Sequence, residues 1–160
     1  MAQVVTDAQT VVVKPWWARV RIVFIGAGLG LLWWVLTALL RFYVIEPLAC
    51  RDLSTATACV DSLSVAGSVA TVLVAIVGTF ILVKTLQPRP LVISASAAAV
   101  LWSLGAYVEG LAWYEAILWG VVLYAVTYVL FGLIANLTRL PVVIGIAVAT
   151  ALIIRLLLLL

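Results

Sequence analysis

The chain has 160 residues, of which 68% are hydrophobic and 9% are charged, and its formal net charge is +3. Soluble domains contain about 45–50% apolar and about 25% charged residues, so this composition excludes a water-soluble fold. The sequence has no histidine and only two cysteines, which excludes histidine-ligated metals, histidine-dependent catalysis and four-cysteine clusters. The sequence contains no phosphate-binding loop that would indicate nucleotide binding, and no run of basic residues that would indicate nucleic-acid binding. We therefore expect no cofactor, no metal and no catalytic site.

Segment 1–15 shows no helical periodicity, and residues 1–19 are predicted to form an amino-terminal cytoplasmic arm. It carries Trp16 and Trp17 next to two arginines, which is typical of an aromatic belt at a membrane surface. Residues 20–160 are predicted to form a single transmembrane helical domain.

Five long stretches carry no charge, and a helix needs about 20 mostly apolar residues to cross a bilayer. Four stretches meet this length, and the fifth meets it when Arg155 and the terminal leucines are included. We therefore predict an all-α bundle of five transmembrane helices; the alternative is four spans with a re-entrant fifth segment. The five stretches are Ile22–Leu40, Ser62–Val83, Pro90–Val108, Ala116–Thr138 and Leu140–Ile154.

The basic residues indicate the orientation of these spans. With a cytoplasmic amino terminus, most of the nine lysines and arginines fall on the inner side, as the positive-inside rule requires. The carboxyl terminus then lies outside. The inner basic residues are Lys14, Arg19, Arg21, Lys84, Arg89 and Arg139.

The largest predicted loop, residues 44–61, lies outside in this topology and contains Cys50 and Cys59. Because disulfides persist on the oxidising side of a membrane, we expect the two cysteines to be joined. Such a bridge would stabilise the loop by roughly 2–3 kcal/mol. The alternative is a pair of free, packed thiols. An oxidised outer loop and a basic inner face favour a bacterial plasma membrane.

Small residues recur at four-residue spacing, which lets helices approach closely within lipid. We expect these faces to pack helices within the bundle, or alternatively to line a pore or a groove for a partner. The residues concerned are Gly26, Gly30, Gly67, Thr71, Ala75, Gly145 and Ala149.

Tyrosine hydroxyls need hydrogen-bond partners away from water. Tyr124 and Tyr128 share one helix face, and Ser96, Ser103 or Thr127 is expected to supply these partners. Tyr124, Tyr128 and Ser103 are the candidates for a polar path through the bundle.

Charged residues near the outer ends of spans are functional candidates. At 1.5 Å per residue, Arg155 lies about 22 Å along its helix and Glu109 about 27 Å along its own, at similar depth. We therefore predict that Arg155 pairs with Glu109 or Glu115. The alternatives are an outer vestibule in which Glu109 handles a cation or proton, and acid–base chemistry by the two carboxylates. No nucleophile or metal ligand accompanies them, so an enzyme is not expected.

These observations favour a non-enzymatic small polytopic membrane protein that acts as an accessory or scaffold subunit of a membrane assembly. The alternative is a small oligomeric transporter or channel for an ion or small solute. The expected partners are the lipid bilayer and other membrane subunits or further copies of the chain, without nucleic acid.

Overall fold

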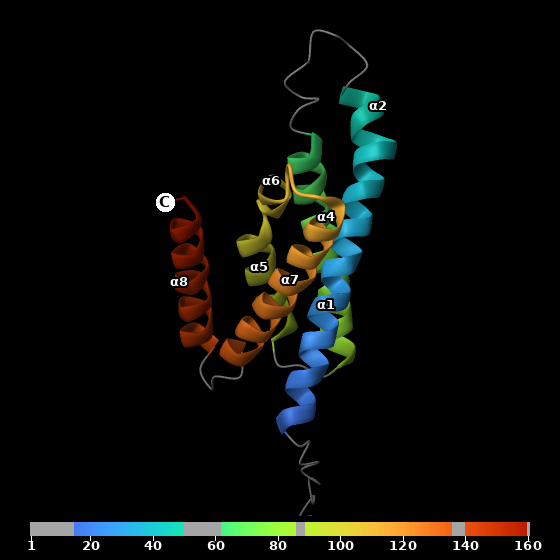
Figure 1. Cartoon of the computed structure of the whole chain (residues 1–160). Helices are drawn as coiled ribbons and strands as arrows, with labels where there is room; N and C mark the ends of the chain where they lie inside the picture. Colours follow the sequence, from blue (N-terminus) through green and yellow to red (C-terminus); the bar gives the residue numbers. More distant parts are fainter. Residues whose placement is uncertain (1–14, 50–61, 86–88, 136–139, 160) are drawn as a thin grey trace, which may run out of the picture.

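The computed structural model describes residues 15–49, 62–85, 89–135 and 140–159, and within these ranges the fold consists of helices and short turns without strands (Figure 1). The prediction of an all-helical fold is confirmed, and four helical segments are long and apolar enough to cross a membrane. They are Val20–Leu48, Ser62–Lys84, Pro90–Tyr107 and Trp113–Ala135. A fifth helix, α8, covers Leu140–Leu159.

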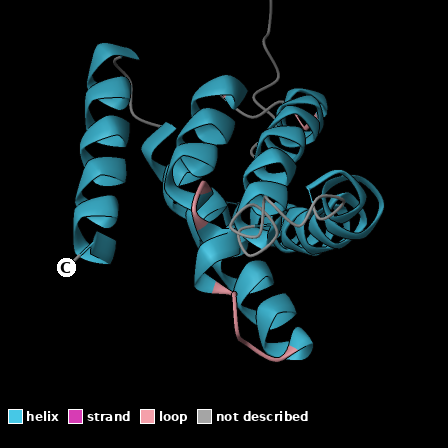
Figure 2. Ribbon diagram, turned by 90° about the horizontal axis from the view of Figure 1, so that it is seen from above, coloured by secondary structure: helices cyan, strands magenta, loops and turns pink. Residues whose placement is uncertain are grey.

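The long helices run up and down the bundle (Figure 1). Helix α1 (Pro15–Leu40) packs on α7 (Trp113–Ala135) and α4 (Ser62–Lys84), and α5 (Pro90–Leu101) packs on α4 and α7. Helix α8 packs on α5 and, less extensively, on α7, so it stands at one side of the bundle (Figure 2).

The first helix extends further at both ends than the sequence predicts. It begins at Pro15, so the last residues of the predicted arm 1–19 are helical. Beyond Leu40 it continues through a π-helix, η1 (Arg41–Ile45), and a short turn of α-helix, α2 (Glu46–Ala49). The predicted loop 44–61 is therefore helical up to Ala49.

The π-helical turn has a cause in the sequence. A proline inside an α-helix lacks an N–H and clashes with the carbonyl four residues before it. Pro47 follows η1 directly, and the wider turn, in which the Glu46 N–H bonds to the Arg41 carbonyl, accommodates its ring.

The predicted span Pro90–Val108 is interrupted by a turn at Trp102 and Ser103, after which α6 (Leu104–Tyr107) follows. The Ser68 hydroxyl lies 3.1 Å from the Trp102 carbonyl, which the break releases from regular helical bonding. Gly105 of α6 then approaches α4 so closely that a Cβ added to it would lie 2.8 Å from the Leu63 carbonyl oxygen. The break therefore tilts this segment onto α4.

The buried core lies between α1, α4, α5 and α7, and Trp33 at its centre has no exposed surface. Bulky apolar side chains cover the outside of the same helices, for example Phe24, which is 73% exposed, and Phe80, which is 68% exposed. A protein in water does not leave this much apolar surface uncovered, whereas lipid solvates it.

Candidate functional site

The closest helix contact joins α1 to α7 through two glycines of the predicted packing set. A Cβ added at Gly30 would lie 2.7 Å from the carbonyl oxygen of Gly120 and 2.7 Å from the Cα of Val121. One added at Gly26 would lie 2.8 Å from the Cα of Ala125. At both places, only glycine fits without a shift of the helices, because the obstructing atoms belong to the backbone of α7.

Helix α1 is joined to α4 by the buried indole of Trp33. Its Nε1–H lies 3.1 Å from both the Gly67 carbonyl oxygen and the Thr71 hydroxyl oxygen. The Thr71 hydroxyl donates to the same Gly67 carbonyl at 2.8 Å. Gly67 and Thr71, both from the predicted packing set, thus also form the polar contact between two helices.

Two tyrosines of α7 extend this cluster toward α5. The rings of Tyr124 and Tyr128 stack with centroids 6.3 Å apart, and the Tyr124 ring lies 6.2 Å from that of Trp33. The Tyr124 hydroxyl lies beside Thr71, and the Tyr128 hydroxyl lies beside Ser94. The buried oxygens of Tyr124 and Ser94 nevertheless make no hydrogen bond of standard geometry.

The predicted tyrosine partners differ from those that the structure provides. Thr71 and Ser94 lie beside the two hydroxyls, whereas Ser96 lines a groove on the far side of α5. Ser103 is half-buried in the turn between α5 and α6, where its carbonyl accepts the Ala106 N–H at 3.0 Å. The four-residue spacing of Tyr124 and Tyr128 identified the face of α7 that they share. It could not identify the residues of other helices that pack against this face.

Glu109 and Glu115, which the sequence analysis predicts near the outer ends of two spans, lie in different elements. Glu109 is exposed in the connection between α6 and α7. Glu115 lies in the first turn of α7, and its carboxylate accepts the Ala112 N–H at 3.4 Å, as a residue that caps the start of a helix does. The side chain of Arg155 lies outside the described residues, so its pairing with Glu109 or Glu115 stays a prediction.

An ion pair that the sequence analysis missed joins Arg41 to Glu46, with Nε 2.8 Å from Oε1. Residues five apart do not face each other on an α-helix, but the π-helical turn bonds each residue to the fifth one along and brings them together. Pro47 was the available signal, because it predicts an irregular helix at this point.

The predicted packing pair of α8, Gly145 and Ala149, lies at no helix contact within the single chain. A Cβ added at Gly145 would meet nothing within 4 Å, and Ala149 is exposed. The expectation that this pair packs within the bundle therefore does not hold. Helix α8 instead buries Val143 and Ala147, whereas Ala75 of the predicted set is half-buried on α4.

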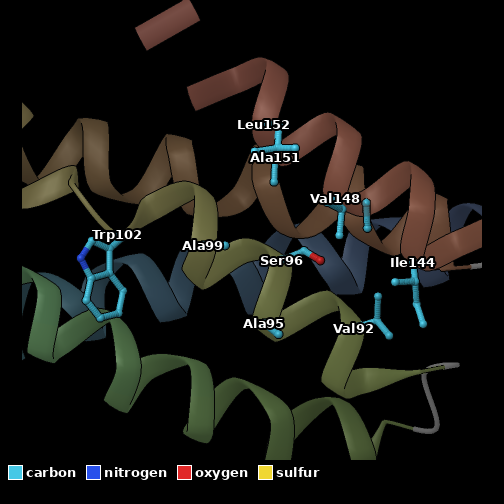
Figure 3. Close-up of a pocket in the computed structure, with 10 residues that line it drawn as sticks. Val92, Ala95, Ser96, Ala99, Trp102, Ile144, Val148, Ala151 and Leu152 are labelled. Atoms are coloured by element: carbon cyan, nitrogen blue, oxygen red, sulfur yellow. The ribbon is translucent and has the colours of Figure 1, made fainter. Parts of the chain in front are cut away.

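An open groove of about 620 Å³ lies between α5 and α8 (Figure 3). Small side chains form much of its lining, because α5 contributes Ala95, Ser96 and Ala99. The bulky indole of Trp102 lies at the α6 end of α5 (Figure 3). The lining residues are Val92, Ala95, Ser96, Ala99, Trp102, Ile144, Ala147, Val148, Ala151 and Leu152.

Cys50 and Cys59 lie outside the described residues, so the disulfide stays a prediction. Among the described residues, no group of three or more histidine, cysteine, aspartate or glutamate side chains could hold a metal ion. Comparison of the chain with protein-family models, curated proteins and solved structures found no match in any of the three.

Proposed function

We propose that this protein is a non-enzymatic accessory or scaffold subunit of a membrane assembly, and that it binds a transmembrane helix of a partner in the groove between α5 and α8. The chain would cross the bilayer five times, with its amino terminus in the cytoplasm of a bacterial cell and its carboxyl terminus outside. The positive-inside distribution of its basic residues supports this orientation.

The groove is the observation that carries the proposal. Apolar side chains do not drive helices together in lipid, where association depends on close packing between small residues. Ala95 and Ala99 of α5 and Ala151 of α8 are among the small residues that line the groove (Figure 3). A partner helix that enters here can approach the backbones of both helices.

The loose attachment of α8 supports the same proposal. A second cavity, of about 430 Å³, lies between α5, α6 and α7, and Ile154 is the one described α8 residue in its mainly apolar lining. Among the α8 residues whose exposure the structure describes, only Val143 and Ala147 are buried. A partner helix in the groove would bury more of α8.

Site-specific photo-crosslinking in the native membrane tests the proposal. A photoreactive amino acid at Ala95 should give one discrete adduct, because this position lines the groove. The same amino acid at Val69 of α4, which is exposed at 43% and lines none of the described cavities, serves as the control. Identical adduct patterns at both positions, or none at Ala95, would contradict a specific partner in the groove.

The cluster of buried hydroxyls favours a second function, that of a small oligomeric transporter or channel. Thr71, Ser94 and Tyr124 come from three helices, and two of their oxygens lack hydrogen bonds of standard geometry. Buried polar groups of this kind mark solute pathways in membrane proteins. In proteoliposomes, solute flux that Tyr128→Phe or Glu109→Gln abolishes would favour this function over the subunit role.

A further inference from the structure

The end of the bundle that carries α2 and α6 holds a third, smaller cavity with a different chemistry from the groove. It encloses about 260 Å³ between the end of α1, the π-helical turn and the connection from α6 to α7. Its lining residues include Arg41, Thr37 and the aromatic residues Trp34, Phe42 and Trp113. A positive charge, a hydroxyl and aromatic walls together suit an anionic group that carries an apolar chain.

Thr37 is the lining residue of this cavity that carries an unpaired hydroxyl. Its side chain is only 3% exposed, and its buried Oγ1 makes no hydrogen bond. Other threonines in these helices donate to the carbonyl four residues earlier, as Thr71 does to Gly67 and Thr79 does to Ala75. Burying an unpaired hydroxyl is costly, so Thr37 is a donor in a position that lacks an acceptor.

Arg41 lies one turn beyond Thr37, so the two side chains share a helix face. Its Nε is held by Glu46, which does not line the cavity. A guanidinium carries five N–H donors, and only one of them is on Nε. Glu46 therefore fixes the orientation of the guanidinium, and the two terminal amino groups can bind an anion in the bidentate geometry that suits phosphate.

In the proposed membrane orientation, the cavity lies at the depth of the lipid headgroups. Arg41 follows the apolar stretch Ile22–Leu40, and at 1.5 Å per residue it lies about 28 Å from Ile22, close to the hydrocarbon thickness of roughly 30 Å. Phe42 and Trp113 are largely exposed at the same end, where aromatic side chains lie at a membrane surface. Gly110, which also lines the cavity, leaves its surroundings open, because a Cβ added there would meet nothing within 4 Å.

We infer that this cavity is a binding site for one anionic phospholipid, whose phosphate is held by Arg41 and Thr37 and whose chain lies along the aromatic side chains. This inference rests on the proposed membrane insertion, but not on a partner in the groove. The two are separable, because the lipid site can be measured on the purified chain alone.

The test is native mass spectrometry of the purified chain after exchange into an equimolar mixture of phosphatidylglycerol and phosphatidylcholine. The wild type should retain one phosphatidylglycerol and prefer it to phosphatidylcholine. Arg41→Gln should lower this preference by about tenfold, because a charge-assisted hydrogen bond is lost. Thr37→Val, which keeps the shape of the side chain, should lower it by about threefold or more.

Three further variants keep the test independent of folding and of net charge. Thr79→Val and Lys84→Gln should leave the preference unchanged, because one removes a hydroxyl and the other a charge away from the cavity. Glu46→Gln breaks the same ion pair as Arg41→Gln but keeps an oxygen that can accept from the Arg41 Nε, so the guanidinium stays oriented and the preference should be kept. Equal retention of the two lipids by the wild type, a Thr37→Val variant that behaves like Thr79→Val, or equal losses in Glu46→Gln and Arg41→Gln would each overturn the inference.

Discussion

Helices α1 and α8 carry the same kind of small-residue motif and use it differently. In α1, Gly26 and Gly30 lie against the backbone of α7, where a Cβ would collide with main-chain atoms. In α8, Gly145 meets nothing within 4 Å and Ala149 is exposed. The motif alone therefore does not determine a contact, since both helices must offer small residues at the same crossing.

The partner residues explain the difference. Gly30 faces Gly120 and Gly26 faces Ala125, so both sides of the α1–α7 crossing are small. Helix α8 approaches α5 with Val143 and Ala147 and leaves its glycine on the outer surface. We interpret the first region as the rigid core of the fold and the second as the surface available to a partner.

The largest expected effect on stability is at Trp33, which links α1 to α4 within the rigid core. Trp33→Ala should lower the free energy of unfolding by about 4 kcal/mol, because it leaves a cavity and removes the hydrogen bonds to Gly67 and Thr71. Reversible unfolding in mixed micelles measures this loss. Trp119→Ala, at an indole that is 52% exposed, is the control and should cost less than about 1 kcal/mol.

A smaller loss of stability is expected at the crossing of α1 and α7. Gly30→Ala should cost about 2 kcal/mol, because the new methyl group forces α1 away from α7. Gly28→Ala places a methyl group in open space on the same helix, and should stabilise it by up to about 1 kcal/mol. If the two variants had equal stability, the close crossing of α1 and α7 would be refuted.

The smallest effect is expected in α8. Gly145→Ala should change the stability of the purified single chain by less than about 1 kcal/mol, in the stabilising direction, since alanine favours the helix and meets no neighbour. The same unfolding assay measures it beside Gly30→Ala. A loss as large as that of Gly30→Ala would remove the distinction between the two helices.

The sequence predicted the helical class and most helix positions, because a lack of charge over about 20 residues is a strong signal. It also singled out Gly26, Gly30 and Gly67, which lie at close helix contacts. It did not predict the π-helical turn before Pro47 or the break at Trp102. Such irregularities depend on neighbouring groups, such as the Ser68 hydroxyl beside the Trp102 carbonyl, that no single segment reveals.

The sites depended on contacts between helices, which a single sequence does not encode directly. Spacing placed Tyr124 and Tyr128 on one face, but not beside Thr71 and Ser94. Trp33 carried a further signal in the sequence, since an indole N–H within an apolar stretch needs a hydrogen-bond acceptor. The position of Thr37 beside the cation of Arg41 emerged only with the fold.

The most direct test of the central claim is the intact mass of the tagged protein, purified from its native membrane in mild detergent, for the wild type, Ala95→Phe and Val69→Phe. Our account predicts a hetero-complex of fixed stoichiometry for the wild type and for Val69→Phe, because Val69 lies outside the groove. Ala95→Phe should lose this complex, because its ring fills the groove. A wild type found only as a monomer or homo-oligomer, or a hetero-complex that survives Ala95→Phe, would contradict it.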